Sequence, residues 1–164
     1  MSEVTVYYLE MRDRQALRAG RPAPELAVAE CRVPQYPVNR FLYQFIGEAW
    51  EWQEKLSWND QQWREYAERD SLRTWLATCQ GSPAGYYELE QQGDEVEIKY
   101  FGLAPAFIGR GFGGHLLSHA INSAWDWANT RRVWVHTCSL DHPSALDNYR
   151  SRGMSLYETE LLPN

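Results

Sequence analysis

Apolar and polar positions in the first half of the chain predict one strand followed by mostly helical structure. Residues 4–9 are rich in β-branched and aromatic side chains, which favours a strand. Four prolines exclude one long helix between residues 22 and 37. Residues 40–69 have a strong helical tendency, and Asn59 followed by Asp60 predicts a cap that separates two helices.

Three strand-like runs follow at residues 72–79, 84–91 and 95–103. The sequences between them, at residues 81–83 and 92–94, are typical of tight turns. Because tight turns join neighbouring antiparallel strands, these runs predict an antiparallel meander.

The remaining pattern predicts helices alternating with strands. Apolar residues recur at helical spacing over residues 113–129, which indicates an amphipathic helix. Residues 132–138 have a strand pattern, and the helix before them allows this strand to lie parallel to residues 95–103. Residues 144–160 predict a short helix that Gly153 ends, followed by a last strand.

The composition fits one globular domain. The chain has 164 residues, of which 44% are apolar, and it contains 8 tryptophans and 10 tyrosines. This is enough to bury a core around a sheet, and it differs from the composition of disordered chains. We find no internal repeat and no linker, so we expect a single domain over residues 1–164.

The charge of the chain limits its partners. The formal net charge is −6 at pH 7, and the basic residues include only two lysines, Lys55 and Lys99. Such a chain has no polycationic surface for a phosphate backbone, so we expect no nucleic-acid partner. A negative surface is compatible with a cationic amine as substrate.

Cysteine usage and the N-terminal sequence predict a cytoplasmic location. Cys31, Cys79 and Cys138 lie far apart, form no Cys-x-x-Cys pair and leave one thiol over from any pairing. The N-terminus has no basic region followed by an apolar one, and no stretch of about 18 apolar residues occurs. We therefore expect no membrane partner.

A glycine-rich turn lies between a predicted strand and a predicted helix. Gly109, Gly111, Gly113 and Gly114 leave the backbone free to point several N–H groups at one anion, beside the positive end of the helix dipole. A phosphate or pyrophosphate is the natural ligand of such a turn. Arg110 either adds a charge-assisted contact or faces solvent.

The turn has three other interpretations. It matches the dinucleotide pattern G-x-G-x-x-G, but it comes too late in the chain to open further βα units. A P-loop is excluded, because His115 and Leu116 follow the last glycine where Lys and Ser or Thr are required. A glycine-rich connection without a ligand stays open on the turn alone.

Two segments of the chain resemble the GNAT superfamily of N-acetyltransferases. Residues 103–113 are similar to that family's strand and turn Q/R-x-x-G-x-G/A, and residues 142–154 to its helix N-x-x-A-x-x-x-Y-x-x-x-G-F. The resemblance covers residues 72–160 well. It implies an α/β (α+β) domain with a mixed, mostly antiparallel central sheet flanked by helices, in which strands 95–103 and 132–138 splay apart.

The resemblance implies acetyl-CoA as the acyl-donor cosubstrate. The pyrophosphate would be held by the turn, at Ile108, Gly109, Arg110, Gly111, Phe112, Gly113 and Gly114. Phe101 and Leu103 would offer main-chain groups to the pantetheine arm. Three positions depart from the family pattern, with Ile108 for Gln or Arg, His142 for Asn and Met154 for Phe. An imidazole can still donate the pantetheine hydrogen bond expected at His142.

The acceptor is expected to be an amine that must lose a proton. An alkylammonium has a pKa of about 10.4, so a base is required at neutral pH. The resemblance directs the search to the central strands, where Glu97 and Glu88 are the candidates. Tyr149 occupies the position of the family's general acid, which protonates the departing thiolate, while a tyrosine packed on the sheet is the structural alternative.

Other reactive residues give weaker signals. His115 and His119 lie one helical turn apart, but no third ligand is evident, so we expect no metal. Cys138 is better explained as a buried thiol than as the site of an acyl-enzyme, so we expect direct transfer. The tryptophans at 50, 52, 58 and 63 either shape a pocket for a cationic acceptor or belong to the core.

Three functions remain open from the sequence. The first is acetyl transfer from acetyl-CoA to the primary amine of a small molecule or peptide. The second is a catalytically silent acyl-CoA-binding or regulatory module on the same scaffold. The third is transfer of a longer acyl group, which would need space beside Phe101 and Leu103. A homodimer is also compatible with the family resemblance.

Overall fold

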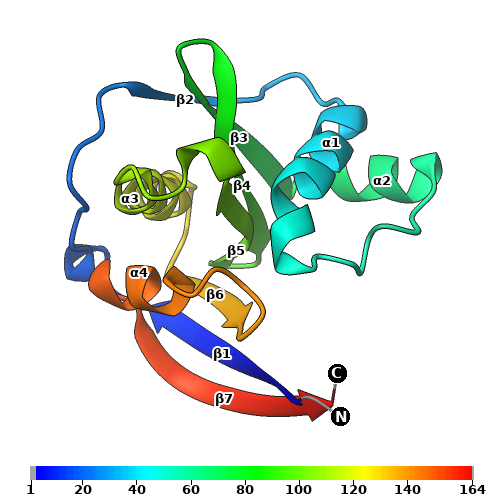
Figure 1. Ribbon diagram of the computed structural model, residues 1–164. Coiled ribbons are helices and arrows are strands. Elements are labelled where there is room, and N and C mark those ends of the chain that lie inside the picture. The colour runs from blue at the N-terminus through cyan, green and yellow to red at the C-terminus, as the bar shows by residue number, and fades with distance from the viewer. Residues whose placement is uncertain (1–2, 164) are drawn as a thin grey trace.

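The computed structural model describes residues 3–163, which form one sheet of seven strands with helices on both faces (Figure 1). The strands are β1 (Glu3–Met11), β2 (Leu26–Glu30), β3 (Leu72–Cys79), β4 (Ser82–Gln92), β5 (Glu95–Leu103), β6 (Arg132–Cys138) and β7 (Ser155–Pro163). The helices are α1 (Tyr36–Gly47), α2 (Asp60–Ala67), α3 (Phe112–Asp126) and α4 (Ala145–Ser151), with 3-10 turns at Arg14–Ala16, Glu48–Trp50 and Pro105–Phe107. Met1, Ser2 and Asn164, which the predicted domain 1–164 includes, lie outside the described residues.

The centre of the sheet is the predicted antiparallel meander. The strand order is β2-β3-β4-β5-β6-β1-β7, and β3, β4 and β5 pair in sequence. Gly81 and Gly93 take φ values of +82° and +66° in the two turns, a conformation that glycine adopts without strain. The predicted strands 72–79 and 95–103 are confirmed at both ends, and the predicted mixed fold is confirmed as well.

Strands β5 and β6 are parallel but separate after a short paired stretch. Pairing runs from Glu95 with Arg132 to Ile98 with Val135, and it stops there although both strands continue. The helix α3 connects them, as a parallel crossover requires. The predicted splay of the two strands is therefore present, and it opens the sheet between Phe101 and Thr137.

A β-bulge at Lys99 accompanies this opening. Glu88 of β4 pairs with Tyr100 and Leu89 pairs with Ile98, so Lys99 has no partner on β4. The extra residue resets the alternation of side chains along β5. Tyr100 consequently faces α1, while Phe101 packs in the core under α3.

The two faces of the sheet carry different helices. In Figure 1, α3 lies on one side of the sheet and α1 and α2 lie on the other. The larger core is packed between the sheet and α3, with Leu116, Leu117 and Ile121 fully buried. A smaller cluster under α1 contains Leu42 and Tyr86. Burial of these apolar side chains provides the main favourable term in folding.

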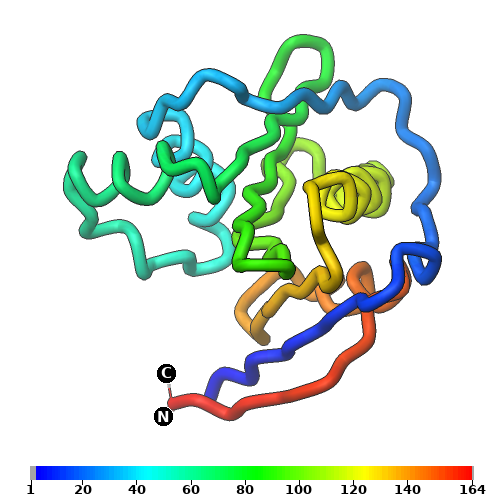
Figure 2. The backbone as a smooth tube through the Cα atoms, turned by 180° about the vertical axis from the view of Figure 1, so that it is seen from behind, coloured from blue at the N-terminus to red at the C-terminus, as the bar shows by residue number. Residues whose placement is uncertain are grey.

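Strand β1 lies between β6 and β7, far from the next strand in sequence. It pairs antiparallel with both, so that Glu3 lies beside Pro163. Figure 2 shows the start of β1 and the end of β7 together at the tip of this pair. The sequence pattern predicted the strand but not its place. Strand β2, at the other edge of the sheet, was not predicted, because it is short and follows a proline-rich stretch.

The predicted helical region 40–69 is interrupted. Asn59 caps α2 as expected, through a capping box in which Asn59 and Gln62 bond each other's backbone N–H groups. Residues 48–59, which we call the tryptophan segment, are largely irregular. Glu51 there has a φ of +57°, and the ring of Trp52 packs over Gly47. Helix propensity alone favours a continuous helix here, but the chain instead packs Trp52 against the end of α1 and gives up the helical hydrogen bonds.

We predict that Gly153→Ala lowers the free energy of unfolding by roughly 3 kcal/mol, because strain and a clash add. Gly153 has a φ of +102°, and a Cβ atom would lie 2.1 Å from the carbonyl oxygen of Ala16. Gly93→Ala is the control, since its Cβ would meet nothing within 4 Å and only the cost of positive φ remains, about 1 kcal/mol. Urea unfolding measures the free energy of unfolding of both variants. Equal losses of stability would contradict the packing described for Gly153.

Candidate active site

The glycine-rich turn presents free N–H groups at the start of α3. Gly109 and Gly111 have φ values of +82° and +81°, and Gly111 is the N-cap of the helix. No side chain caps this helix, and the first N–H groups of a helix have no partner within it. The turn thus combines unpaired donors with the positive end of a 15-residue helix, which together attract an anion.

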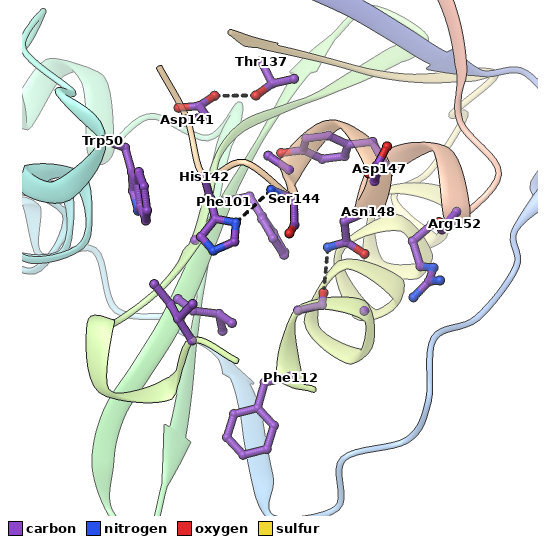
Figure 3. Close-up of a pocket in the computed structure, with 18 of the residues that line it drawn as sticks. Trp50, Phe101, Phe112, Thr137, Asp141, His142, Ser144, Asp147, Asn148 and Arg152 are labelled. Carbon is purple, nitrogen blue, oxygen red and sulfur yellow. Dashed lines mark hydrogen bonds between the residues drawn. The ribbon is translucent and has the colours of Figure 1, made fainter. Parts of the chain in front are cut away.

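A cavity of about 420 Å³ runs from this turn along α4 to the end of β5, and we call it the turn cavity. Figure 3 shows Phe112, Phe101, His142 and Arg152 around it. Ten of the sequence-predicted site residues line it: Phe101, Leu103, Ile108, Gly109, Gly111, Phe112, Gly113, Gly114, His142 and Tyr149. Residues that are far apart in the sequence therefore meet in one cavity.

Arg110 is the one residue of the predicted turn that does not line this cavity. Its guanidinium lies over the rings of Phe107 and Phe112, at 5.3 Å and 5.1 Å from their centroids. The sequence left two alternatives for Arg110, a contact with the bound anion or a position facing solvent. The side chain is exposed, which is the second of these. The charge that Arg110 adds to the turn is therefore held by cation–π contacts.

Helix α4 closes the turn from the other side. Asn148 Nδ2 donates to the carbonyl oxygen of Gly113 at 3.1 Å. Arg152 packs between Gly20 and Gly114, and its Nε is buried without a hydrogen-bond partner among residues 3–163. Both side chains line the turn cavity. They could not be predicted from the sequence, because both occupy variable positions of the family's helix pattern.

Tyr149 lies at the inner end of the turn cavity. Its side chain is buried, and its ring centroid lies 6.2 Å from that of Phe101. No described residue hydrogen-bonds its hydroxyl. Burial, and secondarily the charge of Asp141, raise the pKa of Tyr149 well above its usual range. The phenol therefore stays protonated and available as a proton donor.

A second cavity, of about 400 Å³, opens beyond Tyr149 on the α1 side of the split sheet, and we call it the sheet cavity. The tryptophan segment, β5 and β6 line most of it. Six residues line both cavities: Trp50, Trp52, Phe101, Thr137, Asp141 and Tyr149. The two cavities therefore meet where β5 and β6 separate, and a group held in one can reach a group held in the other.

Asp141 ties together the loops at this junction. Its carboxylate accepts hydrogen bonds from Trp52 Nε1 at 3.3 Å, from the N–H of Cys138 at 3.1 Å and from the hydroxyl of Thr137. The last of these bonds is drawn in Figure 3. An edge-to-face contact of 5.1 Å between Trp50 and His142 makes a second bridge between the same loops. No motif pointed to Asp141, which only precedes His142 in the sequence.

The tryptophans at 50, 52, 58 and 63 were expected either to shape an acceptor pocket or to belong to the core, and the structure contains both cases. Trp63 is 1% exposed and belongs to the core. Trp50 and Trp52 line both cavities. The ring of Trp58 contacts an ammonium, but that ammonium belongs to Lys55 of the chain itself.

Lys55 occupies an aromatic cage. Its Nζ lies 4.7 Å from the ring centroid of Trp58 and 4.9 Å from those of Tyr66 and Tyr100. It donates to the Tyr100 hydroxyl at 2.8 Å and lies 3.6 Å from a carboxylate oxygen of Glu54. Burial lowers the pKa of Lys55, although Glu54 opposes this shift. The cage fixes the tryptophan segment to β5.

Neither of the two candidate bases lines the sheet cavity. Glu97 is 3% exposed and lies 3.5 Å from Nε2 of His136 and 3.8 Å from Nζ of Lys99, both of which line that cavity. Burial raises the pKa of Glu97. Glu88 is 1% exposed, its pKa is also raised by burial, and its oxygens accept hydrogen bonds from Asn39 and Tyr66.

The other reactive residues have structural partners. His115 accepts a hydrogen bond from the N–H of Ala23, and His119 lies 2.6 Å from the Tyr87 hydroxyl. Among residues 3–163 no group of three or more His, Cys, Asp or Glu side chains could hold a metal ion. Burial raises the pKa of Cys138, which disfavours the thiolate that an acyl-enzyme needs. None of the described helices is both long and apolar enough to span a membrane.

Comparison with known proteins relates this arrangement to one family. A model of the Acetyltransferase (GNAT) family matches residues 33–154, which is more than half of the chain. No curated protein matches the chain in sequence. Among solved structures, a GCN5-related N-acetyltransferase from Kribbella flavida is 15% identical with a TM-score of 0.66, over 99% of this chain and 57% of that chain.

Two further structures are similar over about four fifths of this chain. An aminoglycoside acetyltransferase from an uncultured soil metagenomic sample is 16% identical with a TM-score of 0.62, over 79% of this chain and 88% of that one. An IAA acetyltransferase from Bacillus cereus is 21% identical with a TM-score of 0.59, over 81% of this chain and 79% of that one. At these identities the similarity concerns the fold. The chain spans 50% to 63% of the length of the Kribbella flavida structure and of four further similar structures.

We predict that Lys55 and Trp58 are energetically coupled by about 1–2 kcal/mol in a double-mutant cycle of Lys55→Met and Trp58→Leu, because a desolvated ammonium gains most from an aromatic face. Urea unfolding of the four proteins gives this energy. The reference cycle uses Arg40 and Tyr36, a cation–π pair at 5.5 Å with a more exposed cation. Its coupling should be smaller. Equal couplings would mean that the cage adds nothing to the contact.

Proposed function

The chain belongs to the GNAT acetyltransferase family, and on this basis we propose that it transfers the acetyl group of acetyl-CoA to the primary amine of a small molecule or peptide by direct attack. The observation that carries this proposal is the junction of the turn cavity with the sheet cavity beside Tyr149. One cavity suits the acyl donor and the other the acceptor. Acyl transfer requires the two to meet at one point.

The residues of the turn cavity fit coenzyme A. Gly111 leaves the N-cap open, and the unpaired N–H groups that follow it suit a pyrophosphate. The bulge at Lys99 and the loss of pairing after Ile98 leave main-chain groups of β5 near Phe101 free of β6, as an extended pantetheine arm needs. Acetyl-CoA supplies the thioester, and the chain binds and orients it.

Tyr149 is the proposed general acid. As the amine nitrogen bonds the carbonyl carbon, the carbon–sulfur bond breaks and the sulfur needs a proton. The Tyr149 hydroxyl is protonated, free of hydrogen bonds from the described residues and at the inner end of the turn cavity. The departing thiolate forms in the same buried junction, where burial disfavours a charged sulfur as it disfavours a charged phenol, so the hydroxyl can give its proton to the sulfur as the carbon–sulfur bond breaks, and solvent then reprotonates Tyr149.

We propose that the amine proton leaves toward Glu97. The carboxyl of Glu97 reaches the sheet cavity through His136, at 3.5 Å, and its raised pKa moves it toward that of an effective base. Glu88 is the second candidate. It does not line the sheet cavity and its oxygens accept hydrogen bonds from Asn39 and Tyr66, so a proton would need a water to reach it.

We predict that Tyr149→Phe lowers kcat about 100-fold in an assay of thiol release from acetyl-CoA with a panel of amines, because the proton donor is lost. Affinity for coenzyme A should not change, since the ring remains. The kcat of the wild-type protein should not fall on the basic side below about pH 10, because burial keeps the Tyr149 hydroxyl protonated there.

An unchanged kcat in Tyr149→Phe would contradict the role given to this residue. Tight binding of coenzyme A without turnover of any amine would instead favour the silent module. Faster turnover of a longer acyl-CoA than of acetyl-CoA would favour the third function considered for this sequence. Failure to bind any form of coenzyme A would refute all three.

We predict that Gly111→Ala weakens coenzyme A binding by about tenfold or more, because the strained N-cap would misplace the N–H groups that bind the pyrophosphate. Gly81→Ala is the matched control. Gly81 has a φ of +82° against +81° for Gly111, a Cβ would meet nothing within 4 Å at either position, and Gly81 lines neither cavity. Both variants should lose similar stability, about 1 kcal/mol. Calorimetric titration distinguishes them, and equal affinities would contradict the assignment.

A further inference from the structure

The turn cavity contains a permanent positive charge that comes from α4 rather than from the turn. In the described part of the chain, Arg152 is the only arginine or lysine that lines this cavity. Ile108 is apolar, and Arg110 packs on two phenylalanine rings without lining the cavity. The side chains of the turn therefore place no charge in the anion site that its N–H groups form.

Arg152 is unpaired, unlike the other partly buried arginines of the chain. Its Nε is buried and has no hydrogen-bond partner among residues 3–163. Each of the others lies against a carboxylate, in the ion pairs Arg40 with Asp60, Arg69 with Glu90, Arg73 with Glu30 and Arg132 with Glu10. A buried guanidinium without an acceptor costs free energy, because its N–H groups lose their water. An anion in the cavity removes this cost.

The guanidinium is held against the start of α3. A Cβ atom would lie 2.2 Å from Nη1 of Arg152 at Gly114 and 2.4 Å from it at Gly20, so a side chain at either position would displace the guanidinium. In Figure 3 the Arg152 side chain extends from α4 alongside α3. Gly114 belongs to the first turn of α3, whose N–H groups have no partner within the helix. A cation beside the positive end of a helix dipole is repelled unless an anion binds to both.

The loop before β2 adds arginines on the same side. The N–H of Arg18 donates to the carbonyl oxygen of Arg152 at 2.9 Å, and the N–H of Gly20 donates to Ser118 Oγ at 2.8 Å. These bonds fix the loop against α3 and α4, with the exposed Arg18 and Arg21 on either side of Gly20 in the chain. In a chain with a formal net charge of −6, this local excess of arginine favours an anionic ligand.

We propose that Arg152 binds a phosphate group of coenzyme A together with the backbone N–H groups of the turn. The inference rests on the proposed use of acetyl-CoA, and it adds a side-chain determinant to a site otherwise made of backbone. Coenzyme A carries a pyrophosphate and a separate phosphate on its ribose, and both present the oxygen acceptors that a guanidinium fork binds in pairs. Arg152 therefore sets the affinity for the acyl donor and takes no part in the chemical step.

Calorimetric titration of the whole chain with coenzyme A tests this assignment. Arg152→Met removes the charge, and we expect the dissociation constant to rise by about tenfold or more, as the loss of a charge-assisted hydrogen bond requires. Arg152→Lys keeps the charge without the fork and should lose less affinity. Arg150→Met is the matched control and should bind as the wild type does, because Arg150 is an exposed arginine of the same helix that does not line the turn cavity.

Thermal unfolding without coenzyme separates binding from a structural role. Removal of a buried, unpaired charge should leave the melting temperature of Arg152→Met equal to or above that of the wild type. At one concentration of coenzyme A, the melting temperature should then rise less in this variant, because the stabilisation follows the affinity. A lower melting temperature of Arg152→Met without coenzyme would mean that the side chain holds α4 to α3, and it would overturn the inference.

Dephospho-coenzyme A, which lacks the ribose phosphate, identifies the group that Arg152 binds. An equal loss of affinity for both ligands in Arg152→Met assigns the pyrophosphate, and a loss for coenzyme A alone assigns the ribose phosphate. Equal affinity of Arg152→Met and the wild type for coenzyme A, or an equal loss in Arg150→Met, would overturn the inference and leave the proposed function standing. Failure of the wild-type protein to bind coenzyme A would overturn the proposed function as well.

Discussion

The separation of β5 from β6 is the constraint on which the rest of the structure depends. Pairing ends at Ile98 and Val135, and the bulge at Lys99 turns Tyr100 and Phe101 to opposite faces of the sheet. A fully paired sheet would be a closed wall between the α3 side and the α1 side. Because the wall is open, a ligand bound at the start of α3 and a ligand bound under the tryptophan segment can meet at Tyr149.

The tryptophan segment depends on the same opening. It departs from helical geometry to place Trp50 and Trp52 across the split, where they contact the loop after β6 through His142 and Asp141. The caged ammonium of Lys55 fixes it to β5 beyond the bulge. Acceptor access and the stability of this segment are therefore linked.

Local patterns predicted the meander, α3 and the strand after it, because alternation and helical spacing report directly on burial. The place of β1 between β6 and β7 could not be predicted, since a strand pattern does not identify its neighbours. The same distinction applies to the site. The glycine turn and Tyr149 belong to short sequence motifs, whereas Asp141 and the cage of Lys55 exist only through contacts between distant segments. The tryptophans indicated either a pocket for a cationic acceptor or a packed core, and gave no sign that Lys55 of the chain itself lies against Trp58.

The most direct test of the account is to map coenzyme A binding on the backbone amide signals of the isotope-labelled protein by NMR. We expect one equivalent of coenzyme A to shift the amides of Gly109 to Gly114 and those of Phe101 and Leu103, at the end of β5 where it leaves β6. Signals of β2, at the far edge of the sheet, should not move. Saturable shifts confined to another surface, or none at all, would contradict the claim that the opening between β5 and β6 is a coenzyme site.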